Sequence, residues 1–201
     1  PIISPQIKIL SVKENENWKF KATACERPDI KLNNYQEPIA AEMAKTKIWT
    51  PDKGIPNQKK DQKQSYDQKL NIVIKTLLKN VKIKIPDILS KNEVNKMLSR
   101  LLDQVNTLGM TIEQYLASKG LTNEQLKQNY KKRAEETLKL EFTLQEIVKD
   151  RQIKIKEDEI KKLIQATPDP KMRQKLNTPL EKAYLSSILA KRKALDYLIS
   201  L

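Results

Sequence analysis

The sequence TNEQLKQNYKKRAEETLKLEFTLQEIVK, residues 122–149, contains neither glycine nor proline. Thr122 and Gln125 have the spacing of a capping box, in which the two side chains bind the free backbone N–H groups at a helix start. Apolar residues then recur at three- and four-residue steps, which is typical of a helix; they are Leu126, Tyr130, Ala134, Leu138, Leu140, Leu144 and Ile147. The stretch therefore predicts one long α-helix whose apolar face is broader than a single packing stripe.

Helices are also predicted before this stretch. Apolar residues between positions 70 and 81 recur at helical steps. Ser90 and Glu93 have capping-box spacing for a second helix, which Gly109 closes. A short helix is expected between that glycine and Gly120. This part of the chain is therefore expected to consist of helices joined by short turns.

The region after the long helix continues the helical pattern. Residues 158–164 predict a short helix, which Pro168 and Pro170 interrupt. Thr178 is expected to cap the last helix, with Pro179 at its first position, where proline is favoured. The body of the protein is therefore predicted to be all-α.

The first part of the chain has a different periodicity. Apolar residues alternate with polar ones around Lys8 and again between Trp18 and Ala24. Such alternation is typical of strands with one buried face. The polar residues 15–17 between the two runs predict a turn. A small β-hairpin with one buried face is therefore expected ahead of the helices.

Composition divides the chain into three predicted regions. Proline, glycine and uncompensated lysine gather in residues 50–65, which is typical of a connector. We therefore expect a β-rich N-terminal segment with a linker strand at 1–48, a flexible connector at 49–68 and a helical domain at 69–201. The fold class expected from this organisation is mainly α with a small N-terminal β segment.

Residue usage argues against an enzyme or a metalloprotein. The chain has no histidine, which removes Ser–His and Cys–His catalysis and most zinc and iron sites. Its three glycines are isolated, so no phosphate-binding loop is predicted. Cys25 is the single cysteine. We expect no catalytic residue, no metal, no cofactor and no membrane-spanning segment.

Charge leaves an alternative function open. The net charge is +14, an excess that attracts polyanions such as RNA. The basic residues are spread along the chain and interleaved with glutamate and aspartate, which favours solvated helix faces over a dedicated nucleic-acid site. A basic helical protein that binds RNA or ribosomes and has no chaperone activity remains the alternative. Because the sequence begins at Pro1, an upstream signal peptide and an extracytoplasmic location also stay open.

Three motifs resemble those of the trigger factor family. The sequence PDILSKNE, residues 86–93, is similar to the Pro-x-x-Leu-x-x-x-Glu opening of that family's first helical arm. The sequence GMTIEQYL, residues 109–116, resembles the element between its helices. Residues 134–160 are similar to the second arm without a gap, and the matching positions are Ala134, Lys139, Leu140, Leu144, Ile147, Ile153, Glu159 and Ile160.

The N-terminal part resembles the same family but departs from it in two ways. Phe20-x-Ala22 followed by Pro28-x-x-x-Leu32-x-x-Tyr35 is similar to the end of the family's ribosome-docking domain. Members usually insert a prolyl-isomerase domain where this chain has only its short connector, so the resemblance does not imply isomerase activity. The family docks on ribosomes through a Gly-Phe-Arg-type loop, and no glycine of this chain is followed by Phe-Arg. That loop is therefore expected either to lie on upstream sequence or to be lost.

The resemblance implies a fold and a function. It implies trigger-factor-like helical arms that form a cradle, and an ATP-independent chaperone that binds unfolded or nascent polypeptides in the cytoplasm. It also implies the ribosome as a partner. A second copy of the chain is a further expected partner, because apolar surface without a client tends to bind another copy. Candidate peptide-binding residues are apolar or aromatic positions on the predicted helices: Met97, Leu101, Met110, Tyr115, Tyr130, Leu138, Phe142, Tyr184 and Ile188. Most apolar helix residues belong to cores, so these positions are candidates only. Pro86, Gly109, Tyr115 and Ala134 are expected to act mainly as fold determinants.

Overall fold

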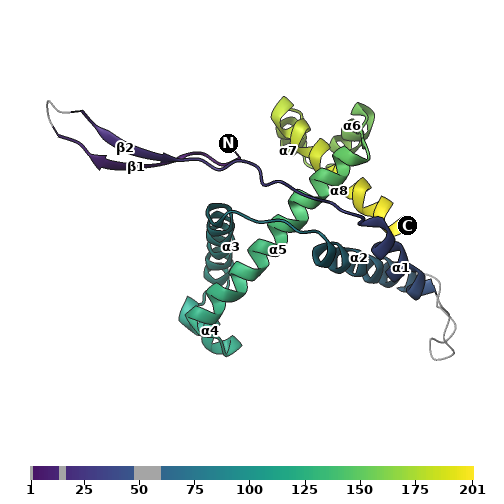
Figure 1. The fold of residues 1–201 in the computed structure, drawn as a ribbon, viewed down its shortest axis with the longest axis horizontal. Coiled ribbons are helices and arrows are strands. Elements are labelled where there is room, and N and C mark those ends of the chain that lie inside the picture. The colour runs from purple at the N-terminus through teal and green to yellow at the C-terminus, as the bar shows by residue number, and fades with distance from the viewer. Residues whose placement is uncertain (1, 14–16, 48–59) are drawn as a thin grey trace. The chain divides into compact units, whose positions relative to one another are not determined.

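The computed structural model describes residues 2–13, 17–47 and 60–201, and it divides the chain into two compact units (Figure 1). The first unit comprises Pro1–Asp29 and Ile83–Lys139, and the second comprises Ile30–Lys82 and Leu140–Leu201. Helix α5, Asn123–Asp150, is a single uninterrupted helix that contributes to both. The mainly α-helical fold with a small β segment is confirmed. Most of the predicted turn at 15–17 and most of the predicted connector at 49–68 lie outside the described residues.

The β segment is a two-stranded antiparallel hairpin. Strand β1, Gln6–Ser11, pairs with β2, Lys19–Thr23, and Ile9 lies opposite Phe20. The side chains of both strands are almost all exposed on both faces. The predicted hairpin is therefore correct, but the predicted buried face is wrong, because a two-stranded sheet brings no second layer of its own to cover it.

The helical part of the first unit contains α3 (Asp87–Thr107), α4 (Ile112–Lys119) and the first half of α5. Gly109 and Gly120 follow α3 and α4 with φ of 68° and 61°, the left-handed conformation that commonly ends helices. Its core is a small cluster formed by the buried residues Leu101, Val105, Leu116 and Leu126.

Two helix starts confirm the sequence prediction and one corrects it. Thr122 and Gln125 form the predicted capping box of α5, and Thr178 caps the last helix through the N–H of Glu181. The predicted cap at Ser90 is wrong. Helix α3 begins earlier because Pro86, whose backbone is fixed in an extended conformation, offers its carbonyl to the N–H of Ser90 at 3.2 Å.

In its described residues, the second unit consists of helices and one isolated antiparallel bridge between Lys31 and Lys82. Its helices are α1 (Gln36–Lys47), α2 (Lys60–Asn80), the second half of α5, α6 (Glu157–Gln165), α7 (Pro170–Leu176) and α8 (Pro179–Ser200). Helix α1 was expected to be a linker strand, and α2 begins inside the predicted connector. Pro38 does not prevent α1, because it lies in the first turn, where no intrahelical N–H bond is lost.

The core of the second unit joins segments that are far apart in the sequence. Helices α1 and α2 pack against each other and against α8. The buried residues of this core are Tyr35, Ile39, Met43, Val73, Leu77, Val81, Leu144, Ile147, Ala194 and Leu198. Residues 30–82 and residues 140–201 therefore depend on each other for burial.

Candidate binding surfaces

Helix α8 carries an exposed apolar stripe. Leu180, Tyr184 and Ile188 are 80 %, 61 % and 38 % exposed. They are spaced four residues apart, so they lie on one face of the helix. We call these three residues the α8 stripe. Since Leu185, Ala194 and other residues of α8 are buried, the helix is apolar on a packed side and on an exposed side.

The neighbouring helices extend the exposed apolar surface of the second unit. Leu163 of α6 and Met172 of α7 are exposed. Ile160, Ile164 and Leu185 form a small buried cluster that joins α6 to α8, and Leu176 of α7 packs against it. The exposed side chains are therefore carried by helices with a packed core of their own, which keeps these side chains on the surface.

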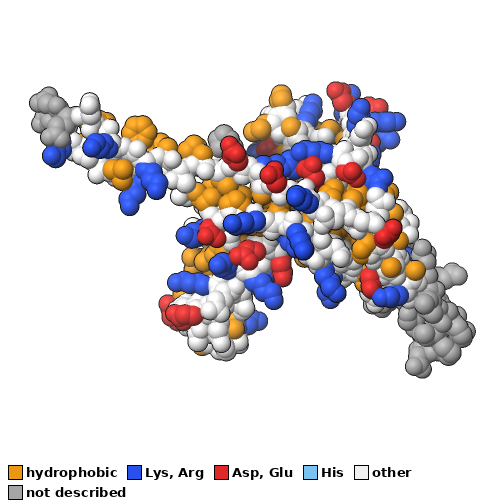
Figure 2. Space-filling model, in the orientation of Figure 1, with side chains coloured by type: hydrophobic (Ala, Val, Ile, Leu, Met, Phe, Trp, Pro, Cys, Tyr) orange, Lys and Arg blue, Asp and Glu red, His pale blue; other side chains and the backbone are white. Residues whose placement is uncertain are grey.

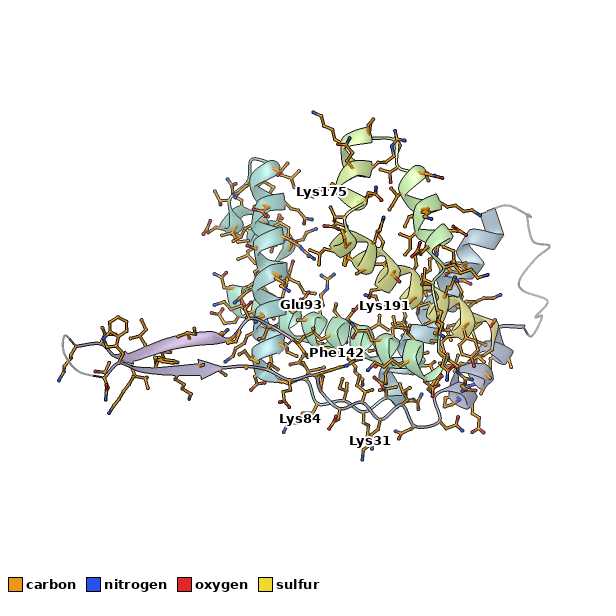
Figure 3. The ribbon with its side chains drawn as sticks, turned by 90° about the horizontal axis from the view of Figure 1, so that it is seen from above. Lys31, Lys84, Glu93, Phe142, Lys175 and Lys191 are labelled. Carbon is orange, nitrogen blue, oxygen red and sulfur yellow. The ribbon has the colours of Figure 1, made fainter. Side chains whose placement is uncertain are left out.

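Ion pairs fix α8 in its place. Lys193 Nζ of α8 lies 2.8 Å from Glu159 Oε1 of α6, and the backbone N–H of Lys156 donates to the same carboxylate. The Lys193 ammonium and this N–H hold the pKa of Glu159 below its ordinary range. Lys191 of α8, labelled in Figure 3, donates to Glu141 Oε1 of α5 at 2.8 Å.

Tyrosine hydroxyls make further connections within the second unit. Tyr35 donates to Asp150 Oδ2 at 2.9 Å and accepts from Arg151 Nε at 3.1 Å. Burial raises the pKa of Tyr35. Tyr66 of α2 donates to Asp196 of α8 at 2.8 Å, and this bond raises the pKa of Tyr66. Tyr66 thus connects α2 to α8, and Tyr35 is connected to the residues at the end of α5.

The first unit presents a different surface, a groove between α3 and α5. It has a volume of about 330 Å³ and is lined by Asp87, Ser90, Lys91, Val94, Asn95, Leu98, Lys127 and Lys131. We call it the α3–α5 groove. The lining residues of α3 recur at three- and four-residue steps and hence share one face, and Lys127 and Lys131 are one turn apart on α5.

The structure places the predicted site residues in three classes. Tyr184 and Ile188 are exposed. Leu101 and Phe142 are buried, with 6 % and 5 % of their surface exposed. The other five are half-buried, namely Met97, Met110, Tyr115, Tyr130 and Leu138.

The first unit brings four of the predicted residues together. Met110, Tyr115 and Tyr130 pack against the cluster that contains Leu101. Arg133 lies over the ring of Tyr130 at 5.8 Å, and burial raises the pKa of this tyrosine. Their contact with a bound polypeptide stays a prediction.

The sequence of α5 predicts more apolar surface than one packing stripe needs, but most of this surface is packed in the structure. Phe142, Leu144 and Ile147 are buried, and Leu138 and Leu140 are half-buried. The helix belongs to both units, so residues beyond a single stripe are used in packing. Exposed apolar side chains lie instead on other elements, among them α8 and the hairpin. On the hairpin, hydrophobic and basic side chains lie side by side (Figure 2).

Sequence reasoning missed several exposed apolar residues. Leu108 is 71 % exposed beside the turn that ends α3. Leu102, Leu163 and Leu180 are also exposed and were not predicted as binding residues. The four-residue spacing of the α8 stripe is visible in the sequence, but the neighbouring residues Leu185 and Leu189 have the same spacing. Only the position of α6 decides which set is buried.

Two kinds of functional feature are absent from the part of the chain that the structure describes. No group of three or more acidic, cysteine or histidine residues there is arranged to hold a metal ion. None of its helices is both long enough and apolar enough to cross a membrane.

Comparison with known proteins identifies the family. A family model described as the C-terminus of bacterial trigger factor protein matches residues 56–200. The trigger factor of Exiguobacterium sibiricum is 26 % identical over 188 residues, which cover 89 % of this chain and 41 % of that protein. The trigger factor of Clostridium beijerinckii is 29 % identical over 109 residues, covering 52 % of this chain and 26 % of the relative. The chain therefore spans about two-fifths or less of the length of these relatives.

A solved structure, described as "Promiscuous Substrate Recognition in Folding and Assembly Activities of the Trigger Factor Chaperone", is similar as well. The TM-score is 0.48, with 18 % identity, and the match covers 98 % of this chain and 50 % of that one. The comparisons do not support the alternative of a basic RNA-binding protein. The match of the family model to most of the chain confirms the resemblance seen in its motifs, and the protein belongs to the trigger factor family.

Proposed function

We propose that this chain is an ATP-independent chaperone of trigger factor type that binds unfolded or nascent polypeptides. The observation that carries the proposal is the α8 stripe, whose Leu180, Tyr184 and Ile188 are exposed on a helix held by a packed core and ion pairs. Family membership supports the proposal, because the matched relatives carry the name trigger factor.

The physics of such a surface suits reversible binding. Burying a large apolar side chain stabilises a complex by roughly 1.5–3 kcal/mol. A few such contacts, set against the entropy lost by an ordered client, give weak binding that reverses without nucleotide. Among the three stripe residues, Tyr184 alone has a group that forms directional hydrogen bonds, so the stripe selects little for one sequence. The α8 stripe therefore fits many unfolded segments and releases them spontaneously.

The test is suppression of aggregation by a stripe variant. A denatured client is diluted into buffer at high salt with the parent or with Leu180→Ser, Tyr184→Ser and Ile188→Ser combined, and light scattering is recorded. We expect the parent to suppress scattering and the variant to lose most of this effect. Circular dichroism should show an intact fold, because the three side chains are exposed.

The matched control removes apolar surface from the hairpin instead. Ile7→Ser, Ile9→Ser and Phe20→Ser replace side chains that are also exposed. We expect this variant to keep the activity of the parent. Equal loss in both variants would assign binding to exposed apolar surface in general, and an inactive parent would refute the chaperone proposal itself.

We further propose that the chain acts in the cytoplasm without enzymatic activity, near ribosomes and in part as a homodimer. The matched family model is that of the C-terminal part of trigger factor, which supports a non-catalytic role. Cosedimentation with ribosomes tests ribosome binding, and analytical ultracentrifugation tests the homodimer. A prolyl-isomerisation assay tests the absence of enzymatic activity. A measurable isomerisation rate, a monomer at every concentration or an absence of ribosome binding would each overturn the corresponding point.

A further inference from the structure

The α3–α5 groove combines an apolar floor with a basic rim. Val94 and Leu98 lie one helical turn apart on α3 and line it with apolar surface. Lys91, Lys127 and Lys131 line it with positive charge. Asp87 is the one acidic residue among the lining residues. The groove therefore favours a ligand that is apolar in part and negatively charged in part.

The basic rim is poorly neutralised by the protein itself. Within the described residues, Lys91 and Lys127 form no ion pair. Lys131 lies 4.0 Å from Glu135, a separation at the limit of an ion pair between exposed side chains, which contributes little. The charge of the three lysines is therefore available to a bound ligand.

A buried hydroxyl in the lining also lacks a partner. Ser90 is buried, and its Oγ has no hydrogen-bond partner among the described residues. A buried polar group without a partner is unusual and costs stability. In a rotamer turned toward the groove, this hydroxyl donates to an acceptor that enters there. The unpartnered hydroxyl and the lysines thus favour the same kind of group, a carboxylate.

We propose that the α3–α5 groove binds client segments in which an apolar side chain is flanked by acidic residues. The apolar side chain contacts Val94 and Leu98, and the carboxylates pair with Lys91, Lys127 and Lys131. This inference rests on the proposed chaperone function and names the class of segment that this surface selects. The α8 stripe, by contrast, carries no such requirement for charge.

The lining of the groove favours a peptide over RNA. Proteins bind single-stranded RNA largely by stacking its bases on aromatic side chains. No aromatic residue is among those that line the groove, and its floor is aliphatic. A volume of about 330 Å³ lies at the lower end of the range of small-ligand sites and suits a few side chains of an extended chain.

The test compares two labelled peptides of the same length. The first contains leucines flanked by glutamates, and the second has glutamine at each glutamate position. Fluorescence anisotropy is measured with the full chain at about 50 mM and about 500 mM salt. We expect the acidic peptide to bind about fivefold more tightly at low salt, and this preference to shrink at high salt because salt screens exposed charges.

Two charge variants locate the preference. Lys91→Gln, Lys127→Gln and Lys131→Gln combined should reduce it to about one while leaving the neutral peptide's affinity unchanged. Lys75→Gln, Lys154→Gln and Lys162→Gln remove the same charge from exposed positions outside the groove, and this variant should keep most of the preference. Ser90→Ala should weaken the acidic peptide alone.

The outcomes separate this inference from the proposed function. Equal affinity for both peptides, or equal loss in both lysine variants, would overturn the inference while aggregation suppression by the parent would still support the chaperone. Displacement of the acidic peptide by an RNA oligonucleotide that binds more tightly, with a steep dependence on salt, would assign the groove to nucleic acid. A parent that neither suppresses aggregation nor binds either peptide would refute both proposals.

Discussion

At the scale of single residues, Ser90 shows how an energetic defect can mark a site. Its buried hydroxyl has no partner among the described residues of the folded protein. We predict that Ser90→Ala raises the free energy of unfolding by about 1–2 kcal/mol, because it removes a desolvated polar group and improves helix propensity. Urea unfolding followed by circular dichroism measures the change.

The control for Ser90 lies on the same helix. Ser99 of α3 is exposed, so Ser99→Ala should gain only the propensity difference of about 0.5 kcal/mol. Equal gains in the two variants would show that the Ser90 hydroxyl carries no penalty. A stabilised Ser90→Ala protein with weaker acidic-peptide binding would show that the defect is kept for function.

At the scale of helices, the pair Glu159–Lys193 connects α6 to α8. Because its partners stabilise the ionised carboxylate, the pKa of Glu159 is lower in the folded state than its unfolded value of about 4.3. Its stabilising effect is therefore present above that value and is lost as pH falls through the folded-state pKa. We predict that Glu159→Gln lowers stability at neutral pH but not at strongly acidic pH, as measured by urea unfolding.

The neighbouring Glu157 provides the comparison. Its side chain is largely exposed and lies 3.8 Å from Lys161 on the same helix. Glu157→Gln should change stability little at any pH, because exposed pairs of this kind contribute little. A destabilisation by Glu159→Gln that persists unchanged at acidic pH would contradict the role of its charge.

The helices also show how far the sequence predicts this structure. The caps at Thr122 and Thr178 depend on local spacing, and both are confirmed. Helix α1 was missed because Pro38 and the preceding asparagines favour an extended chain locally, whereas Ile39 and Met43 are held in a core made by α2 and α8. The exposed side of α8 and the uncovered hairpin depend on which elements pack beside them. Such non-local packing leaves no trace in a short window of sequence.

At the scale of the whole molecule, the two units should unfold separately in part. Ile147→Ala opens a cavity in the core of the second unit, and Leu101→Ala does so in the cluster of the first. Each change should cost about 2–5 kcal/mol. We predict that Ile147→Ala speeds amide hydrogen exchange in α1, α2 and α8 about tenfold or more, whereas Leu101→Ala does so in α3 and α4.

Mass spectrometry of exchanged peptides distinguishes these patterns, and each variant is the control for the other. Helix α5 runs through both units, so its two halves should respond to different variants. If either variant speeds exchange across all helices equally, the chain unfolds as one cooperative body, and the division into two units has no thermodynamic counterpart.

The interleaved order of the two units has a consequence for the synthesis of the protein. Helices α1 and α2 are made before residues 83–139, but they share their core with Ala194 and Leu198, near the end of the chain. At about 5–20 residues per second, translation leaves the apolar faces of these helices without their final partner for several seconds or longer. During that interval the emerging polypeptide exposes the kind of surface that chaperones bind, so a protein proposed to protect nascent chains itself passes through a state that requires such protection.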